Sequence, residues 1–342
     1  MTVTVVDFFS GCGGTSLGFR NAGMSIVAGI DNDPDAAETY RTNFPEATFF
    51  ERDIRSLKIK EVAAVIPKGQ PVLFSGCAPC QPFSKQRRTE KDDDPRRFLL
   101  AEFQRFVVSL KPDYVVVENV PGMQKVDDAG PLKAFIAALE KLRYDVNYRI
   151  LAAIDYGVPQ VRRRLVLVAS KKTVAIMPQP THGSGGERYA TFRDWASGIA
   201  EIPAGGVDKV DPDHAAMALS PINVKRILAT AEGKGRESWN DELLLDCHRS
   251  HKGHSDVYGR LSWDKPASAM TTRCLSYSNG RYGHPDQPRA ISLREAACLQ
   301  TFPRDFRFSG SLLSKGRQVG NAVPPLLAQR IAETILATLP VK

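Results

Sequence analysis

The stretch TVTVVDFFSGCGGTS, residues 2–16, indicates how this chain begins to fold. Residues 2–9 form an apolar run typical of a buried strand, and a glycine-rich segment follows directly. Glycine lets the backbone turn sharply and approach a ligand closely, as it does between the first strand and first helix of a doubly wound sheet. The stretch therefore predicts a strand over residues 2–9, a glycine turn, and a helix that starts at Ser16.

Strand-like and helix-like segments alternate through the rest of the first half. Several strand candidates are continuous runs of Val, Ile and Phe, as expected for strands covered on both faces. This alternation predicts an α/β fold with a doubly wound, mostly parallel sheet. The further expected strands are 25–31, 47–50, 71–75, 113–118, 146–154 and 164–169, and the expected helices are 16–21, 34–42, 98–110 and 131–142.

The alternation fades after Ser170. Residues 178–260 are rich in Gly, Pro, His and charged side chains, and only short helices are expected, over 192–199 and 221–231. Helical periodicity returns over 292–300 and 324–336. We predict a second, smaller and irregular domain.

Length and composition limit the class of protein. A chain of 342 residues can bury a large core and form about two domains. Lys and Arg outnumber Asp and Glu by 46 to 38, and the net charge of +8 suits a polyanionic partner such as nucleic acid. The sequence has no apolar run of membrane-spanning length and no basic leader, and its six cysteines are irregularly spaced. These features favour a reducing cytoplasm or nucleus.

Acidic residues that follow the early strands indicate a nucleoside cofactor. Asp31 ends the second strand and can hold ribose hydroxyls, and Asp53 follows the third strand and can accept from an adenine amino group. The glycine stretch is not GxGxxG, because Ser16 stands in place of the third glycine, and it lacks the lysine of a phosphate-binding loop. S-adenosylmethionine fits this pattern. The alternative is a structural turn with surface acids.

Cys80 is the candidate nucleophile. It stands in GCAPCQPFS, residues 76–84, after the apolar run 71–75, and a thiolate is the strongest side-chain nucleophile near neutral pH. Cys77 and Cys80 also form a CxxC pair, which leaves a redox or zinc role as an alternative. The sequence has no second CxxC pair to complete a zinc site.

Glu118 and an arginine cluster are the other candidates for chemistry. Glu118 ends a buried strand at the edge where ligands of open sheets bind, and it can act as an acid or hydrogen-bond partner. The alternative is an ion pair or a helix cap. Strand alternation predicts Arg162 and Arg164 on one side, where they could lower a thiol pKa and bind an oxygen-rich ligand. The alternative is that these basic residues at the start of the strand form an ion pair with a carboxylate.

Four residues in the irregular region have the side chains of metal ligands. The region is basic and rich in loops, so polar surface or DNA contacts are favoured over zinc. The four residues are Cys247, His248, His251 and His254.

Five segments, in this order, resemble the motifs of bacterial DNA (cytosine-5)-methyltransferases. They are residues 7–14 (cofactor), 79–81 (nucleophile), 118–120, 160–164 and 316–325. The resemblance covers nearly the whole chain and implies a sheet of the S-adenosylmethionine-dependent methyltransferase type. It also implies a catalytic domain over 1–180 plus 313–342, and a target-recognition domain and hinge over 181–312. The chain departs from the family at 269–270, where Ala-Met replaces a Thr followed by a branched aliphatic residue.

The resemblance also implies a mechanism. A cytosine is flipped out of a duplex, Cys80 adds to C6, Glu118 contacts N3 and the exocyclic amine, and Arg162 assists at O2. Arg164 supports the site or the nucleophile loop, and residues 85–88 lie on a loop that closes over DNA. The residues implied to line the cofactor site are Phe9, Gly11, Gly14, Asp31, Asn32, Asp53, Pro79 and Asn321.

The implied partners are double-stranded DNA and a cognate restriction endonuclease, with the chain acting as a monomer near the nucleoid. One alternative is a tRNA cytosine-5 methyltransferase of the same fold, which the absence of a Cys-Phe-Thr tripeptide disfavours. A second is a nucleic-acid-binding protein that has lost catalysis. A third is a nicotinamide dehydrogenase, which Ser16 disfavours.

Overall fold

A computed structural model of the chain describes residues 2–78, 99–122, 130–250 and 256–339. Its contacts form two compact units. Unit 1 comprises Met1–Ala152, Arg163–Pro180 and Val323–Lys342, and unit 2 comprises Ala153–Arg162 and Thr181–Ala322. The predicted catalytic and target-recognition domains are functional assignments and stay predictions.

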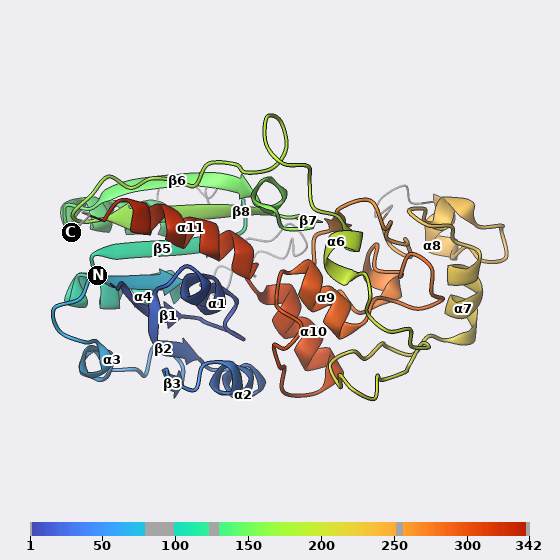
Figure 1. Cartoon of the computed structure of the whole chain (residues 1–342), viewed down its shortest axis with the longest axis horizontal. Coiled ribbons are helices and arrows are strands. Elements are labelled where there is room, and N and C mark those ends of the chain that lie inside the picture. The colour runs from blue at the N-terminus through green and yellow to red at the C-terminus, as the bar shows by residue number, and fades with distance from the viewer. Residues whose placement is uncertain (1, 79–98, 123–129, 251–255, 340–342) are drawn as a thin grey trace. The chain divides into compact units, whose positions relative to one another are not determined.

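Unit 1 is built on a sheet of seven strands in the order β3-β2-β1-β4-β5-β8-β6 (Figure 1). The first five strands of that order are parallel, whereas β8 is antiparallel to both of its neighbours. The predicted mostly parallel, doubly wound sheet is confirmed. The strands are β1 (Thr4–Phe8), β2 (Ser25–Asp31), β3 (Thr48–Glu51), β4 (Val72–Gly76), β5 (Tyr114–Asn119), β6 (Asp145–Ala152) and β8 (Arg163–Ser170).

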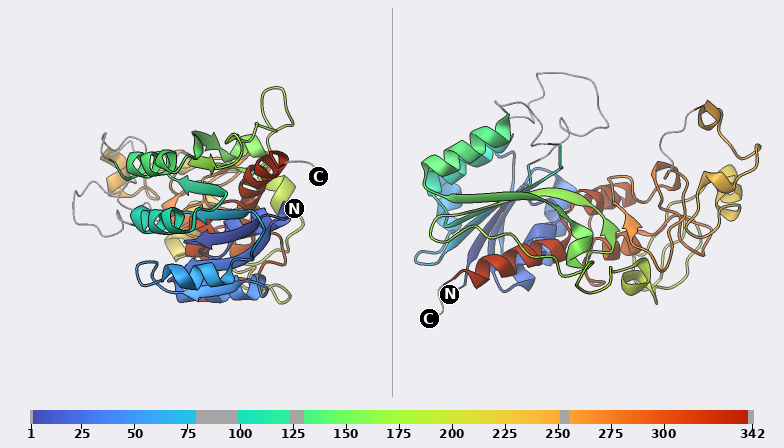
Figure 2. Two further views of the ribbon diagram at one scale, coloured as in Figure 1. Left: turned by 90° about the vertical axis from the view of Figure 1, so that its left-hand side faces the viewer. Right: turned by 90° about the horizontal axis from the view of Figure 1, so that it is seen from above.

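Helices cover both faces of this sheet. Figure 2 shows α4 and α5 on one face and α11 on the other. Helix α11 packs on α1 at a glycine: a Cβ on Gly18 would lie 2.2 Å from the carbonyl oxygen of Pro325. The helices of unit 1 are α1 (Gly14–Asn21), α2 (Pro34–Asn43), α3 (Ile59–Val65), α4 (Leu99–Leu110), α5 (Pro131–Lys141) and α11 (Pro325–Ala337). The sequence pattern did not predict α3.

The apolar core lies between the sheet and helices α4 and α5. The ring of Phe8 lies 5.2 Å from that of Phe74 on β4 and 5.1 Å from those of Phe103 and Phe106 on α4. All four side chains are fully buried, and burial of each contributes roughly 1.5–3 kcal/mol. This packing fixes β1 and β4, the two strands that lead to the predicted cofactor and nucleophile segments.

One predicted strand is too long at its carboxyl end. The expected strand over 146–154 ends at Ala152, and the chain then enters a 3₁₀ turn, η4 (Ala153–Tyr156), in unit 2. The β-branched and aromatic residues of 153–158 are therefore not a continuation of the sheet. Tyr156 and Val158 are buried in the other unit, which periodicity alone does not reveal.

Unit 2 consists of short elements joined by long irregular segments, as predicted. Helix α6 ends at Ala196 and α7 at Leu228, both earlier than expected, and α10 was not predicted. The elements are β7 (Gln160–Val161), which pairs with β9 (Ala267–Ser268), helices α6 (Phe192–Ala196), α7 (Pro221–Leu228), α8 (Asp246–Ser250), α9 (Leu293–Leu299) and α10 (Leu312–Asn321), and 3₁₀ turns η5 (Arg236–Ser238) and η6 (Tyr277–Asn279).

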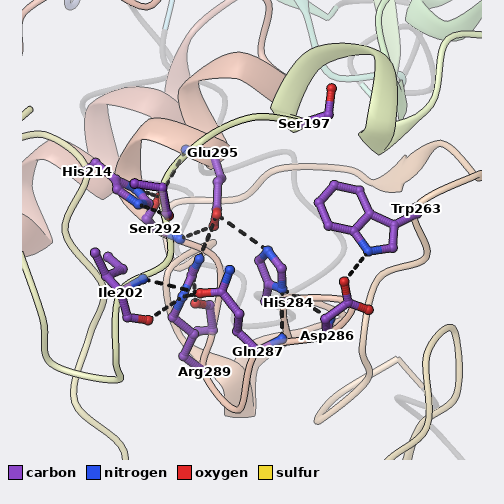
Figure 3. Close-up of polar contacts among 12 residues, drawn as sticks. Ser197, Ile202, His214, Trp263, His284, Asp286, Gln287, Arg289, Ser292 and Glu295 are labelled. Atoms are coloured by element: carbon purple, nitrogen blue, oxygen red, sulfur yellow. Dashed lines mark hydrogen bonds and ion pairs between the residues drawn. The ribbon is translucent and has the colours of Figure 1, made fainter. Parts of the chain in front are cut away.

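A buried polar network stabilises the irregular segments of unit 2 (Figure 3). Glu295 on α9 accepts two hydrogen bonds of 2.7 Å from the guanidinium of Arg289 and lies 3.6 Å from Nε2 of His284. Burial lowers the pKa of His284 to about 4, so its ring is neutral. Its Nδ1 accepts from the backbone N–H groups of Asp286 and Gln287. Side chains thus satisfy backbone groups that a strand or helix would otherwise pair.

Among the residues that the structure describes, no helix is both long and apolar enough to cross a membrane.

Candidate active site

The turn between β1 and α1 is built for close approach to a ligand. Phe9, Gly11 and Gly13 all have positive φ, of 56°, 51° and 94°. A Cβ on Gly13 would also lie 2.4 Å from the Phe44 ring, so both backbone conformation and space require glycine there. Gly14 begins α1, and no side-chain cap covers the N-terminus of that helix. The backbone N–H of Gly13 donates to the Ser10 carbonyl at 2.9 Å, which fixes the shape of the turn.

Asp31 is held rigidly at the end of β2. Its Oδ2 accepts from the backbone N–H of Gly11 at 2.8 Å, and its Oδ1 accepts from those of Asn32 at 2.8 Å and Asp33 at 3.0 Å. Burial raises the pKa of Asp31, and these three hydrogen bonds counteract the rise. The half-buried carboxylate and exposed Asn32 form a fixed polar edge beside the glycine turn. A ribose fits such an edge, because its hydroxyls are donors to a carboxylate.

Asp53 follows β3 and is partly exposed. Its carboxylate accepts from Nε of Arg55 at 2.9 Å, Nη2 of Arg55 at 2.6 Å and the Arg55 backbone N–H at 2.9 Å. The Arg55 side chain lowers the pKa of Asp53. The group is therefore an ionised acceptor near neutral pH, as contact with an adenine amino group requires.

The segment that leads to the predicted nucleophile is fixed up to Ala78. A Cβ on Gly76, the last residue of β4, would lie 2.8 Å from the Phe103 ring. The Ala78 carbonyl accepts from Nδ2 of Asn119, at the end of β5, at 3.3 Å. The expected site residues Pro79 and Cys80, and the expected DNA-contacting residues 85–88, lie outside the described residues.

Cys77 is held as a thiol. Its pKa is raised well above the ordinary range, first by burial and then by the nearby carboxylates of Glu118 and Asp7. Its Sγ lies 3.7 Å from Oγ1 of Thr15. A protonated thiol is a poor nucleophile and a poor metal ligand.

No cluster in the described residues has the composition of a metal site, for which at least three His, Cys, Asp or Glu side chains must converge. Cys247 is exposed, and burial lowers the pKa of His248. The other two members of the metal-like set, His251 and His254, lie outside the described part.

Glu118 and Arg164 form an ion pair in unit 1. Arg164 Nε lies 2.8 Å from Glu118 Oε1, and both side chains are largely buried. The pair follows from strand register: Glu118 on β5 is opposite Val166 on β8, and Arg164 is two residues away on the same face. The arginine therefore orients the carboxylate that the sequence analysis singled out.

The unbroken alternation from which Arg162 and Arg164 were predicted to point the same way is not present. The strand is interrupted at Arg162, because β7 ends at Val161 and β8 begins at Arg163. Arg162 is 2% exposed, and its guanidinium donates to the carbonyls of Met270 at 2.9 Å, Ala322 at 3.0 Å and Gly320 at 3.3 Å. Arg162 thus binds backbone of unit 2, whereas Arg164 binds a carboxylate of unit 1.

Two glutamines extend this buried network in unit 2. Gln160 donates to Gln300 Oε1 at 2.7 Å and accepts from the Met270 backbone N–H at 3.0 Å. Gln300 in turn donates to the carbonyls of Val319 and Ala322. Gln300 was not predicted, because a single glutamine at the end of an amphipathic helix carries no signal in the sequence.

The network holds the carboxyl end of α10. Gly320 has to be glycine, because a Cβ there would lie 2.0 Å from the carbonyl oxygen of Thr271. Asn321, the expected cofactor residue of the last motif, ends α10 and is exposed.

The expected residues of unit 1 meet at one edge of the sheet. Strands β1, β2, β4 and β5 are parallel, so their carboxyl ends share that edge, and ligands of open α/β sheets bind there. This edge carries Phe9, Asp31, Cys77 and Glu118. A glycine turn after β1, an anchored acid at the end of β2 and a mostly parallel seven-stranded sheet are typical of S-adenosylmethionine-dependent methyltransferases.

Comparison with known proteins gives the family within this class. The family of C-5 cytosine-specific DNA methylases matches residues 3–337. The chain belongs to this family, and it is a DNA (cytosine-5)-methyltransferase.

The similar proteins include enzymes of type II systems. The chain is 41% identical over 341 residues to the type II methylase M.HgiDII of Herpetosiphon aurantiacus, covering 98% of this chain and 95% of that protein. It is 34% identical to the type II methyltransferase M1.HphI of Haemophilus parahaemolyticus, covering 98% and 87%.

Two solved structures share the fold. A putative DNA modification methyltransferase encoded within an E. coli prophage has a TM-score of 0.78 at 24% identity, with 98% of this chain and 99% of that chain covered. The Dnmt2 methyltransferase of S. pombe has a TM-score of 0.64 at 17% identity, with 98% and 99% covered.

Proposed function

We propose that this methyltransferase modifies a flipped cytosine in a specific duplex sequence, using S-adenosylmethionine and a transient covalent bond to Cys80. The observation that carries the proposal is the shared sheet edge. The anchored carboxylate of Asp31 and the oriented carboxylate of Glu118 both lie there, and β4 leads from it toward Cys80.

S-adenosylmethionine supplies a methyl group on a sulfonium sulfur. Asp31 and Asn32 are proposed to hold the ribose, and Asp53 the adenine amino group. Phe9, Gly11 and Gly14 supply the turn that the cofactor lies against. Pro79 and Asn321 are proposed to complete the same site.

Cys80 is proposed to add its sulfur to C6 of the cytosine, because C5 is otherwise too weakly nucleophilic. The electron pair displaced from the C5–C6 bond is delocalised toward N3 and O2. Glu118 in its protonated form stabilises this charge by donating a hydrogen bond or its proton to N3, its other oxygen accepts from the exocyclic amine, and Arg164 keeps the carboxyl group in place. After C5 carries the methyl group, a water molecule takes the C5 proton, the freed electron pair re-forms the C5–C6 double bond, and the Cys80 sulfur leaves as a thiolate.

The contact of Arg162 with O2 of the base stays a prediction. In unit 2 its guanidinium donates to three backbone carbonyls, which favours a positioning role over direct contact. Double-stranded DNA is the proposed substrate, and the net charge of +8 suits it. A cognate restriction endonuclease, a monomeric state and a cytoplasmic, nucleoid-associated location also stay predictions.

Methyl transfer from labelled S-adenosylmethionine tests the proposal. The purified chain should label duplex DNA and leave tRNA unlabelled, and bisulfite sequencing should map the label to cytosines in one sequence context. Cys80→Ser should abolish the label, whereas Cys77→Ser should keep most of it, because Cys77 is a protonated thiol. Labelling of tRNA alone, or full activity in Cys80→Ser, would contradict the proposal.

A further inference from the structure

Asp7 is a fully buried carboxyl group that the proposed mechanism leaves without a role. It lies in the middle of the sheet, where β1 pairs with Gly29 of β2 on one side and with Ser75 of β4 on the other. Its side chain is 0% exposed. In the described part of the chain, no ion pair involves Asp7. A buried carboxylate without a cation is costly, so the group calls for an explanation.

Its hydrogen bonds connect the sheet to two helices. Ser16, in the first turn of α1, donates its hydroxyl to Oδ2 of Asp7 at 2.7 Å. The Ser16 oxygen lies 2.8 Å from the Tyr40 hydroxyl on α2. Since Ser16 already donates to Asp7, Tyr40 is the donor in this second bond. Asp7 thus ends a chain of hydroxyls directly beneath the glycine turn.

The other carboxyl oxygen faces an unsatisfied hydroxyl. Within the described residues, Asp7 Oδ1 and Ser75 Oγ are both buried and have no hydrogen bond of good geometry. Asp7 and Ser75 are register neighbours on parallel strands, so their side chains lie on the same face of the sheet. A proton on Oδ1 directed at Ser75 would satisfy both groups and leave no charge in the interior.

The surroundings of Asp7 favour this neutral form. Burial raises the pKa of Asp7 to about 7, the hydroxyls of Ser16 and Ser75 counteract the rise, and the charge of Asp31 adds to it. The other titratable groups that act on Asp7 are Tyr40 and Cys77, and burial raises both of their pKa values well above the neutral range.

We propose that Asp7 is a positioning residue that acts as a neutral acid. It joins Ser16 of α1 to Ser75 of β4 and so keeps the turn of residues 9–14 closed in the form that binds cofactor. Ionisation of Asp7 places a charge beneath the turn, and opening of the turn relieves that charge by admitting water. Cofactor binding is therefore coupled to uptake of one proton by Asp7. This inference rests on the proposed cofactor site.

The test is the affinity for S-adenosylhomocysteine, the non-reactive product, measured by titration calorimetry between about pH 6 and 8.5. Coupling to one proton weakens binding by up to about tenfold per pH unit above the Asp7 pKa. Asp7→Asn, a neutral group of the same shape, should remove this slope and bind at least as tightly as the wild type at high pH. Calorimetry in buffers of different ionisation enthalpy should show proton uptake by the wild type only.

Ser16→Ala provides a second variant. The Ser16 hydroxyl lowers the pKa of Asp7, so its loss should raise that pKa. The pH at which the affinity for S-adenosylhomocysteine begins to fall should therefore be higher in this variant. Asp31 cannot account for the predicted slope, because a ribose-binding carboxylate favours tighter binding as it ionises, which is the opposite sign. The amino group of the ligand titrates equally with every variant.

The inference would be overturned if the affinity of Asp7→Asn for S-adenosylhomocysteine fell with pH as steeply as that of the wild type. It would also be overturned if the wild type bound this ligand equally well at every pH. If Asp7→Asn does not fold, an affinity that begins to fall at the same pH in Ser16→Ala as in the wild type would overturn it. Absence of binding at every pH would instead contradict the proposed cofactor site.

Discussion

Arg164 Nε lies 2.8 Å from Oε1 of Glu118, across two neighbouring antiparallel strands at the ligand-binding edge of the sheet. This contact links the family motif at residues 160–164 directly to the motif at residues 118–120. It also separates the roles of two arginines that stand two residues apart. Arg164 orients a carboxylate, whereas Arg162 holds backbone carbonyls.

Replacement of Arg164 by Ala should impair turnover more than folding. Glu118 keeps its place on β5 but loses the partner that fixes its rotamer. We expect kcat to fall by roughly a hundredfold, the low end of what a positioned acid contributes, with KM for cofactor nearly unchanged. Steady-state kinetics on duplex DNA measure this effect. Arg163→Ala, at an exposed neighbouring position, is the matched control, and equal losses in the two variants would refute the role of Arg164.

Replacement of Arg162 by Ala should instead destabilise unit 2. The variant leaves the carbonyls of Met270 and Gly320 without their arginine donor and that of Ala322 with Gln300 alone, and a loss of about 3 kcal/mol follows from hydrogen bonds to a charged group. Thermal unfolding should show a midpoint lower by about 5–10 °C. A midpoint equal to that of the Arg163→Ala control would show that these contacts carry no stability.

Two glycines of α10 should respond differently to replacement by Ala. A Cβ at Gly320 would lie 2.0 Å from a backbone carbonyl oxygen, whereas one at Gly316 would meet the flexible end of Leu275 at 2.9 Å. Gly320→Ala should therefore cost roughly 1–3 kcal/mol. Gly316→Ala should be nearly neutral, because alanine favours a helix by up to about 1 kcal/mol. Denaturant titration compares the two, and a more stable Gly320→Ala protein would contradict the packing described.

The Asp7 carboxyl should make stability fall as pH rises. Its pKa is about 7 in the folded protein against the ordinary 3.8, so the folded state binds the extra proton. The stabilising contribution is full below about pH 4 and is lost progressively up to pH 7, by as much as about 4 kcal/mol. Asp7→Asn should flatten this decline between pH 5 and pH 7 in chemical unfolding experiments. A parallel decline in both proteins would assign the effect to other groups.

The sequence predicted the sheet well because its strands are buried on both faces and leave continuous apolar runs. Helix α10 was missed because Gly316 and Gly320 lower its helical signal, yet close packing is what requires Gly320. The break at Arg162 was missed for a similar reason. Alternation assumes an unbroken strand, and the contacts that draw Arg162 out of it come from residues more than 100 positions away.

The candidate site was predicted as a set of residues but not as a set of contacts. The positions of Asp31 and Glu118 follow from strand ends, which the sequence indicates directly. The role of Arg164 as a partner of Glu118 depends on an antiparallel register that periodicity does not specify. Asp7 looked like one more strand residue, because nothing in the sequence shows that Ser16, Tyr40 and Ser75 surround it.

Covalent trapping tests the central claim most directly. The wild-type chain is incubated with S-adenosylmethionine and a duplex in which 5-fluorocytosine replaces the target cytosine, so that the final proton cannot leave C5. Denaturing electrophoresis and peptide mass mapping should show a protein–DNA adduct on the peptide that contains Cys80, formed also by Cys77→Ser and absent from Cys80→Ser. Methylation of ordinary DNA without any such adduct, or an adduct on another residue, would contradict the account.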